Sequence, residues 1–387
     1  MNEISLAFPV TYANANKYLP LINYLGDKIS NCYGLGFPKG FVFTKEYPQE
    51  KLNCTKIPLR TALIVGKLST IFKYPSYYSY WSKITLCDYI FSFQIKKDPA
   101  KILYVSPLFK RTIAEAKKKG MIVVVEAGNS EPKREYERIM HDYASYNIKH
   151  KYVYGDTWFR DTCLYSLKTA DKVITISKVS AKTYEDAGYD MSKFMLIPLT
   201  GTDMPLQKLE QSENKEKAFI STGFHNFIKG TQELLLAWKD AGIKDIPLLI
   251  VGRICEDLKD FIEQYGPFDN VKYIGHRSDL KDWYSTYDGV GVLLSLSEGA
   301  GRVTPEMMSY GFPMIVSNDA TCDIIVDGIN GYIVDTYDID QVSKRLKWFA
   351  EDWTRVKDMR KAVLNSVSHR SVKDYSLECG YYLESLI

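Results

Sequence analysis

Two glutamates in the segment 295–318 could do chemistry together. Glu298 and Glu306 are separated by seven residues, and Gly299 and Gly301 follow the first of them. A glycine has no Cβ, so the backbone beside Glu298 can approach a ligand closely and direct its N–H groups toward it. Backbone N–H groups of this kind bind anions, and the two carboxylates would flank the bound group. The predicted chemistry is therefore anion binding between two acids.

A short helix is expected directly after this turn. Thr304 and Pro305 are a typical N-cap and first-turn pair, and Gly311 with Pro313 is a typical stop signal. The start of a helix carries about +0.5 charge, which would favour an anion in the preceding turn. A tight strand-to-helix connection with acids at the helix start would have the same residues, so the turn alone leaves that structural interpretation open.

Neither a metal site nor a disulfide framework is predicted. The seven cysteines never form a C-x-x-C pair, and the five histidines show no HExxH spacing. Asp338 and Asp340 spell Asp-x-Asp, a sequence that can bind metal. Here Asp340 is expected instead to cap a helix whose Val342, Leu346 and Phe349 face one side.

The elements that position these residues alternate between strand and helix. Such alternation predicts parallel sheets. Ser177 and Thr231 are expected N-caps of helices that end at Gly188 and Gly242. The polar stretch 206–217 separates two series of strands and is the expected domain boundary. The expected strands are 102–106, 121–127, 172–177, 194–199, 218–222, 247–252, 271–275, 289–295 and 313–317.

Size and composition agree with two soluble-type domains. The chain has 387 residues, 45% of them hydrophobic and 25% charged, which excludes wholesale disorder and coiled coil. The longest stretch without a charged residue, 4–16, is too short for a membrane span, which needs ~20 apolar residues. The first residues do not read as a secretory signal. A cytoplasmic protein is expected.

Charge is unevenly distributed along the chain. Residues 39–119 contain 16 Lys and Arg against 5 Asp and Glu, interleaved with aromatic residues. This segment is either an ordinary solvated basic face or a surface that meets anionic lipid headgroups or a phosphate-bearing acceptor. The lipid alternative predicts that Tyr77, Tyr78, Tyr80 and Trp81 are exposed. Nucleic acid is a weaker alternative because the rest of the chain is acidic.

The segment 295–318 as a whole resembles the signature of family 4 of the retaining, nucleotide-sugar-dependent glycosyltransferases, the glycosyl transferases group 1. The segment 221–230 is similar to that family's strand and Lys-Gly loop, and 170–203 resembles more loosely its last N-domain elements. Residues 1–120 show little beyond strand and helix alternation. The residues that carry the resemblance are Glu298, Gly299, Gly301, Glu306, Gly311 and Pro313, with Gly223, Lys229 and Gly230.

This resemblance implies the GT-B fold, an α/β architecture with two Rossmann-like domains facing each other across a cleft. Residues 1–203 plus 370–387 would form the acceptor-binding domain, because the last helix of that fold returns to the N-terminal domain. Residues 204–369 would form the domain that binds the nucleotide sugar. No cofactor is implied, since the nucleotide sugar is a co-substrate.

The resemblance also implies roles for individual residues. Lys229 would pair with the donor's diphosphate, and the amides of 299–303 would hold phosphate and sugar oxygens. Glu306 would bind the ribose hydroxyls and Glu298 the donor sugar near its anomeric carbon. Fixed cations and N–H donors would lower the barrier to cleaving a glycosyl phosphate. The implied donor-binding set is Gly223, Lys229, Arg253, His276, Arg277, Glu298, Gly299, Ala300, Gly301, Arg302, Val303 and Glu306.

The sequence departs from the family pattern at three places. Phe224 stands where an arginine is usual, and Arg302 is a candidate replacement for that cation. Glu131 lies in a segment where many relatives have a histidine, and its carboxylate could orient or deprotonate an acceptor hydroxyl; a solvated loop acid is the alternative. The expected loop 10–16 lacks the usual glycine pair. The candidate catalytic residues are Glu298, Lys229, Glu131 and Arg302.

The function implied is a metal-independent retaining glycosyltransferase that acts on a saccharide or polyprenyl-linked acceptor in bacterial surface polysaccharide synthesis. Residues 39–119 would contact the inner face of the cytoplasmic membrane, and no nucleic acid partner is expected. Two alternatives are a non-catalytic sugar-nucleotide-binding partner subunit and a GT-B nucleotide-sugar epimerase. The partner subunit would bind nucleotide without hydrolysis or transfer, and the epimerase would consume donor without an acceptor.

Overall fold

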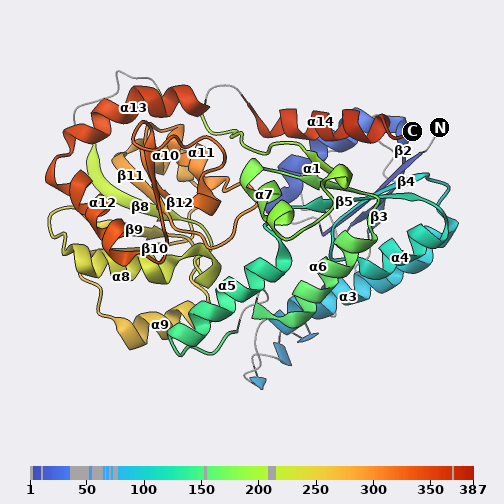
Figure 1. Ribbon diagram of the computed structural model, residues 1–387, viewed down its shortest axis with the longest axis horizontal. Helices are drawn as coiled ribbons and strands as arrows, with labels where there is room; N and C mark the ends of the chain where they lie inside the picture. Colours follow the sequence, from blue (N-terminus) through green and yellow to red (C-terminus); the bar gives the residue numbers. More distant parts are fainter. Residues whose placement is uncertain are drawn as a thin grey trace.

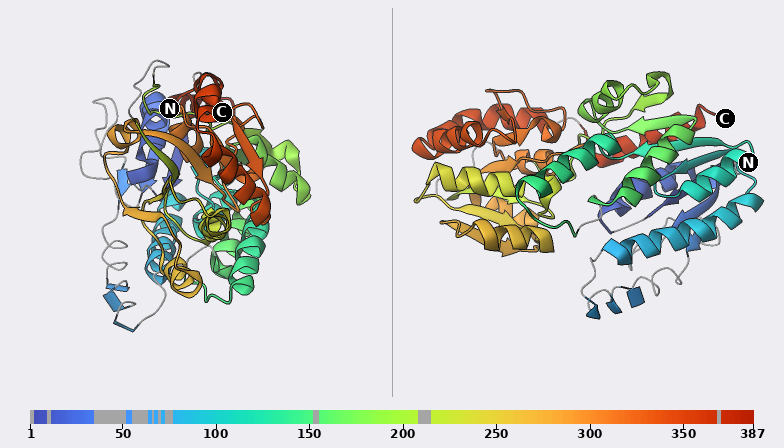
Figure 2. Two further views of the ribbon diagram at one scale, coloured as in Figure 1. Left: turned by 90° about the vertical axis from the view of Figure 1, so that its left-hand side faces the viewer. Right: turned by 60° about the horizontal axis from the view of Figure 1, so that its bottom comes forward.

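The computed structural model describes residues 3–9, 12–34, 52–54, 64–65, 67–68, 71–72, 77–151, 155–207, 215–367 and 370–387. Within these ranges the strands form two separate parallel sheets, each lying between layers of helices (Figures 1 and 2). The first half of the chain builds one sheet and the second half builds the other. The predicted α/β class with two parallel-sheet domains is confirmed.

The first sheet has the strand order β3-β2-β1-β4-β5-β6-β7, with parallel pairing throughout its described strands. The order reverses between β1 and β4, and ligands of such sheets bind beyond the carboxyl ends of the strands at that point. The strands are β1 (Ile4–Phe8), β2 (Ile29–Gly34), β3 (Leu52–Cys54), β4 (Ile102–Val105), β5 (Ile122–Ala127), β6 (Lys172–Thr175) and β7 (Phe194–Leu196). The helices are α1 (Tyr12–Leu25), α3 (Tyr77–Gln94), α4 (Lys110–Lys118), α5 (Pro132–Ser145), α6 (Thr157–Thr169) and α7 (Lys178–Asp186).

The second sheet has the order β10-β9-β8-β11-β12-β13 and reverses between β8 and β11. Its strands are also parallel. They are β8 (Glu216–Thr222), β9 (Leu248–Val251), β10 (Val271–Gly275), β11 (Tyr287–Leu293), β12 (Met314–Ser317) and β13 (Gly331–Val334). The helices of this sheet are α8 (Thr231–Ala241), α9 (Glu256–Tyr265), α10 (Leu280–Ser285), α11 (Val303–Met308), α12 (Ile339–Glu351) and α13 (Thr354–Val367), and the chain ends with α14 (Val372–Glu384).

The central strands are buried on both faces. Every residue of β4, β9 and β12 is buried, because helices cover the two sides of a parallel sheet. This explains why the strands read as continuous apolar runs in the sequence. Among the helices that the structure describes, none is long and apolar enough to cross a membrane.

The last helix returns to the first domain. In Figure 1, α14 lies along the same side of the first sheet as α1. A Cβ on Gly380 would lie 2.4 Å from the ring of Tyr24, so the absence of a side chain at Gly380 lets the two helices approach closely. The Tyr24 hydroxyl also donates to Glu384 at 2.8 Å. The predicted packing of the last helix on the N-terminal domain is confirmed.

Helix α5 connects the two domains. It follows β5 of the first sheet, but Ile139 and Tyr143 belong to the hydrophobic core of the second (Figure 1). The ring of Tyr143 stacks on Phe227 with centroids 4.4 Å apart, and Gln232 donates to Asp142 at 2.8 Å. The helix therefore packs against both domains, on α6 of the first and on the 227–229 turn of the second.

Several expected element ends differ from the structure. Residues 12–16, expected as a loop, already lie in α1, since no glycine pair delays the helix start. Helix α8 is preceded by Gly230 in the left-handed conformation, so Thr231 is its first residue and not its N-cap. Asp338 and not Asp340 caps α12, by accepting from the Gln341 N–H at 2.9 Å. Much of the predicted boundary 206–217 and of the segment 39–76 lies outside the described residues.

Candidate functional site

A cavity of about 240 Å³ lies between the two domains, beyond the carboxyl ends of their strands. The second domain contributes the residues of the predicted Gly-rich turn together with Lys229. The first domain contributes residues of α1 and of the loops after β5, β6 and β7. We call this the donor cavity. Its lining is Lys17, Gly128, Asn129, Ile176, Leu199, Lys229, Glu298, Gly299, Ala300, Gly301, Arg302 and Val303.

Lys229 and Glu298 form an ion pair at the wall of this cavity. Lys229 ends a 3-10 turn, 227–229, which Asn226 caps by accepting from the Lys229 N–H at 3.2 Å. Glu298 also accepts from the Ser295 hydroxyl at 2.7 Å, so one carboxylate oxygen, Oε1, has two donors. The two residues that the sequence predicts on separate loops are therefore brought together.

The Gly-rich turn lies against the backbone of the first domain. A Cβ on Gly299 would come within 2.0 Å of the Gly128 carbonyl oxygen, so only glycine fits here. The Ser177 hydroxyl donates to the Gly299 carbonyl at 2.5 Å, and the Ser130 hydroxyl to the Glu298 carbonyl at 3.1 Å. The turn is thus fixed by both domains and closes the cavity.

The helix after the turn begins differently from the prediction. Its N-cap is Arg302, and the Thr304 hydroxyl donates to the Ala320 carbonyl at 2.7 Å instead of capping. Gly301, at φ 54°, turns the chain into the helix two residues early. Arg302 lines the donor cavity, and its Nε is buried without a hydrogen-bond partner among the described residues.

Glu306 lies one turn into α11 and outside the donor cavity lining. Its carboxylate is 3.6 Å from the Arg302 guanidinium. Burial raises the pKa of Glu306, and the nearby Arg302 opposes that shift. A half-buried carboxyl group whose paired cation is 3.6 Å away keeps oxygens that can bind a neutral hydroxyl.

Four predicted donor-binding residues lie along the same sheet edge but outside the cavity lining. Gly223 follows β8, where its carbonyl lies 1.8 Å from the position a Cβ of Gly252 would take. Arg253 and His276 are exposed after β9 and β10. The Arg277 guanidinium donates through Nε to the Asp279 Oδ1 atom at 2.9 Å, so its ion-pair partner lies in the same loop.

The structure gives Glu131 a role different from the predicted one. It is the N-cap of α5, and its carboxylate accepts from the Arg134 N–H at 2.7 Å and from the Tyr189 hydroxyl at 3.3 Å. It is buried and lines neither of the cavities described here. Because Pro132 occupies the first helical position, the preceding residue is placed to cap the helix.

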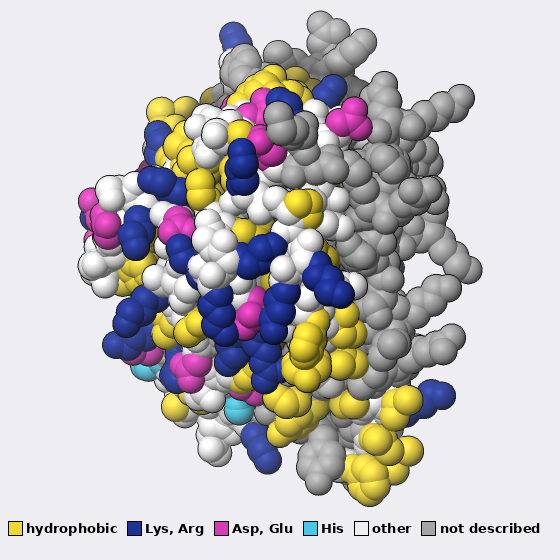
Figure 3. All heavy atoms as spheres, turned by 90° about the vertical axis from the view of Figure 1, so that its right-hand side faces the viewer, with side chains coloured by type: hydrophobic (Ala, Val, Ile, Leu, Met, Phe, Trp, Pro, Cys, Tyr) yellow, Lys and Arg dark blue, Asp and Glu magenta, His cyan; other side chains and the backbone are white. Residues whose placement is uncertain are grey.

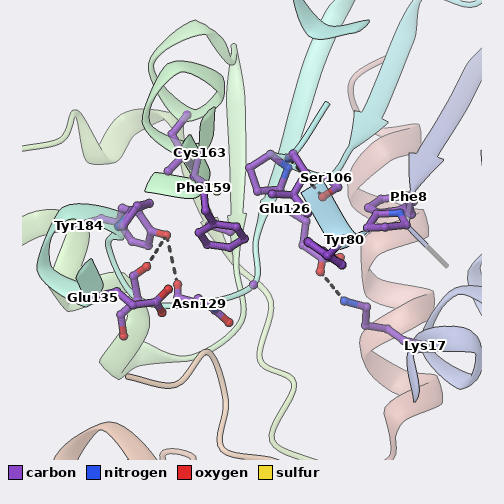
Figure 4. Close-up of a pocket in the computed structure, with 18 of the residues that line it drawn as sticks. Phe8, Lys17, Tyr80, Ser106, Glu126, Asn129, Glu135, Phe159, Cys163 and Tyr184 are labelled. Atoms are coloured by element: carbon purple, nitrogen blue, oxygen red, sulfur yellow. Dashed lines mark hydrogen bonds and ion pairs between the residues drawn. The ribbon is translucent and has the colours of Figure 1, made fainter. Parts of the chain in front are cut away.

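A second cavity, of about 320 Å³, lies in the first domain at the carboxyl ends of β1, β4 and β5 (Figure 4). We call it the N-domain cavity. It shares Lys17, Gly128 and Asn129 with the donor cavity, so the two adjoin. Five aromatic side chains contribute to its wall, from several elements of the first domain: Phe8, Tyr18, Tyr80, Phe159 and Tyr184.

Two buried carboxylates of the N-domain cavity were missed by sequence reasoning. Glu126, at the end of β5, forms an ion pair with Lys17 and accepts from the hydroxyls of Tyr104 at 2.6 Å and Tyr375 at 3.1 Å. Glu135, on the first turn of α5, accepts from the Ser297 hydroxyl of the other domain at 2.6 Å. Glu135 falls one helical turn after Glu131, and this spacing on the buried face was the available signal.

An ionic contact between α5 and Asp319 also holds the two domains together. Arg134 binds the Asp319 carboxylate through two nitrogens, at 2.7 and 3.0 Å, and Arg138 binds it at 2.8 Å. The Asp319 side chain is only 3% exposed. A buried carboxylate needs such partners, and removing them would leave an uncompensated charge.

Comparison with known families gives a match in the second half of the chain. Residues 206–365 match the family model described as "Glycosyl transferases group 1". The matched stretch is less than half of the chain. The match includes Lys229, the Gly-rich turn and Glu306. No protein of curated function matches the sequence.

Solved structures show that the whole chain has the GT-B fold of known glycosyltransferases. Sucrose-phosphate synthase from Thermosynechococcus elongatus is similar with a TM-score of 0.69 and 15% identity, covering 100% of this chain and 99% of that one. HepE from Anabaena, in complex with UDP and glucose, has a TM-score of 0.65 and 14% identity, covering 100% of both chains. TarM has a TM-score of 0.58 and 14% identity; it covers 78% of this chain, which spans 58% of TarM.

Proposed function

We propose that the protein is a retaining, metal-independent glycosyltransferase. It would move a sugar from a nucleoside-diphosphate sugar to a hydroxyl of a saccharide or lipid-linked acceptor, in the synthesis of a bacterial surface polysaccharide. The observation that carries this proposal is the pairing of Lys229 with Glu298 beside the Gly-rich turn, at the mouth between two GT-B domains.

The donor's diphosphate would bind where Lys229 and Arg302 meet the amides of the turn. Lys229 is held by a single carboxylate, and a diphosphate would offer it more negative charge than Glu298 does. Arg302 has a buried Nε that is free to donate. Two side-chain cations and several N–H groups can stabilise the leaving diphosphate, which is the task a metal ion performs in other transferases.

Glu298 would bind the donor sugar and Glu306 the ribose, as the family resemblance implies. When Lys229 pairs with the diphosphate in place of Glu298, the Glu298 carboxylate can accept hydrogen bonds from sugar hydroxyls on the same cavity wall. The positive charge that develops on the sugar ring would then lie beside a carboxylate. Retention of the anomeric configuration follows from the resemblance, and proton NMR of the product would test it.

The N-domain cavity would bind the acceptor. Its wall combines aromatic rings with a few buried polar groups, the usual composition of a pocket for a saccharide or another small polar molecule. It adjoins the donor cavity at Lys17, Gly128 and Asn129. An acceptor hydroxyl placed at this junction would face the donor sugar.

A lipid-linked acceptor would require contact with a membrane, and the outer face of α3 suits one. Tyr78, Trp81, Tyr89 and Phe93 are exposed on this helix at helical spacing. Cations accompany the last two: Arg111 lies 5.7 Å from the Tyr89 ring and Lys96 lies 5.1 Å from the Phe93 ring.

Aromatic residues with neighbouring cations favour the headgroup layer of an anionic membrane. Figure 3 shows dark blue Lys and Arg side chains beside yellow hydrophobic ones at this end of the molecule. One residue of the predicted set differs: Tyr80 is half-buried and lines the N-domain cavity. The side chain of Tyr77 lies outside the described residues.

A thermal-shift panel of UDP, GDP, dTDP, ADP and CMP, each with its common sugar nucleotide, tests the proposed function. A ligand at 100 times its Kd should stabilise the fold by about 2.7 kcal/mol. The sugar nucleotide that binds is then incubated alone and with saccharide acceptors, with and without EDTA. Transfer that survives EDTA supports the proposal. Binding without turnover would indicate a partner subunit, and turnover to an isomeric donor would indicate an epimerase.

A further inference from the structure

Glu135 lies in the N-domain cavity at the contact between the two domains. It comes from α5 of the first domain and lines the N-domain cavity, with its residue 3% exposed (Figure 4). Its Oε2 accepts a hydrogen bond from Ser297 of the second domain at 2.6 Å. Ser297 directly precedes Glu298, the residue beside the proposed donor sugar. Glu135 is thus the carboxylate of the N-domain cavity that is connected to the donor turn.

We propose that Glu135 binds the attacking hydroxyl of the acceptor and accepts its proton. This inference rests on the proposed function. In the step, the acceptor oxygen forms a bond to the anomeric carbon of the donor sugar on the same face from which the diphosphate leaves, so that the configuration is retained. The bond from that carbon to the diphosphate oxygen breaks, and its electron pair leaves with the nucleoside diphosphate. The hydroxyl proton moves to a Glu135 oxygen and is later released to solvent.

The other two acids near the cavity, Glu126 and Glu131, already have hydrogen-bond or ion-pair partners. Glu126 is bound by Lys17 and by the hydroxyls of Tyr104 and Tyr375. Glu131 caps α5 and lies outside the cavity lining. Glu135 accepts one hydrogen bond from Ser297 across the domains and one from Asn129 of its own domain, and its carboxylate has further lone pairs for a substrate hydroxyl.

The surroundings of Glu135 suit a base at neutral pH. Burial raises the pKa of Glu135 to about 7, and the negative charge of Glu298 adds to that shift. Lys229 and the hydrogen bonds from Ser297 and Asn129 oppose it. A general base is most effective when its pKa lies near the working pH. The carboxyl group can therefore take up and release a proton during turnover.

The remaining titratable neighbours stay neutral in this range. Cys163 on α6 and Tyr184 on α7 line the same cavity, and burial raises the pKa of both groups above their ordinary values. Two ion pairs lie near Glu135: Lys229 with Glu298 of the second domain, and Lys17 with Glu126, which line the same cavity as Glu135. A pH effect centred near 7 therefore reports on Glu135 itself.

The test compares wild type with E135Q and with E137Q as a matched control. Glu137 is exposed on the same helix, and its side chain is 62% accessible. The probe is the sugar nucleotide that gives the largest thermal shift in the panel above, with water as the acceptor. Release of nucleoside diphosphate is followed from pH 5.5 to 8.5, and binding of the free nucleoside diphosphate is measured by calorimetry.

Wild type and E137Q should show a kcat that rises through pH 7 as Glu135 loses its proton. E135Q should lose at least about 100-fold in kcat, the usual contribution of a general base, while nucleoside diphosphate affinity stays within about threefold. The rise of kcat near pH 7 should disappear in E135Q. Glutamine keeps an oxygen that can accept from Ser297, so its fold should be retained.

A second variant keeps the inference testable if E135Q does not fold. S297A removes a hydrogen bond that lowers the pKa of Glu135, so the kcat limb should move to higher pH. Wild-type kcat and an unchanged pH limb in E135Q or S297A would overturn the role of Glu135. If no sugar nucleotide of the panel binds wild type, the proposed function itself fails, and this outcome is distinct because it precedes any variant.

Discussion

Replacing Gly299 by alanine should separate donor binding from closure of the cleft. The new methyl carbon would lie 2.0 Å from the Gly128 carbonyl oxygen and 2.7 Å from the Ile176 Cδ1 atom. Ordinary contact begins at 3.4 Å, so the two backbones must move apart by about 1.4 Å. Gly299 is not among the glycines with positive φ, so alanine is tolerated by the turn itself. The methyl group therefore acts on the contact between domains and not on the local fold.

A misplacement of about 1 Å can reduce a catalysed rate about 100-fold, which corresponds to about 2.7 kcal/mol of transition-state stabilisation. We expect G299A to lose at least this factor in kcat, measured as release of nucleoside diphosphate. Calorimetry should show a smaller loss in nucleoside diphosphate affinity than in kcat, because the side chains of Lys229 and Arg302 are untouched although the amides of the turn are displaced. G188A is the control, since Gly188 has a positive φ and no atom near its Cβ position, so it carries only the local strain. Wild-type turnover by G299A would refute the reasoning.

The remaining predictions concern the donor site and the membrane face. Lys229→Ala should weaken nucleoside diphosphate binding far more than nucleoside binding in calorimetry, because its partner is phosphate charge; equal losses would contradict the assignment. Glu306→Gln should mainly raise the KM of the donor, whereas Glu298→Gln should mainly lower kcat, because only Glu298 would lie beside the carbon whose charge changes. The reverse pattern in steady-state kinetics would exchange their roles. Wild type should co-sediment with vesicles that contain anionic lipid, less so as salt shortens the Debye length from ~30 to ~8 Å, and Phe93→Ser should weaken this binding. Indifference to anionic vesicles at low salt would favour a soluble acceptor.

Strands and the Gly-rich turn could be predicted because their signals are local. Strand β4 and the run Val123–Val125 of β5 are buried, so each of these positions is apolar and the strand can be recognised from the sequence. The turn 298–303 reads clearly because glycines, acids and a helix start occur within a few residues. The start of a helix is harder to predict where two neighbouring residues can both act as its N-cap, as Asp338 and Asp340 can at α12.

Residues of the first domain that face the cleft could not be identified in this way. Glu131 lies beside a proline in the segment where a functional residue was expected, and helix capping uses its carboxylate. Glu135 lies on the same helix and reaches Ser297 across the cleft. Its position depends on how the two sheets are placed relative to each other, which no local pattern encodes. Lys17 lies at the shared wall of the two cavities for the same reason.

Helix α5 has a consequence for how the protein divides into parts. Ile139, Tyr143 and Ile148 fill the core of the second domain, although they precede β6 of the first. A fragment that began after residue 207 would lack these three apolar side chains. If the chain were cleaved between residues 207 and 215, the two pieces should therefore remain associated, because α5 of the first piece packs in the core of the second. An opening of the cleft would therefore have to break the contacts of α5 with one of the two domains.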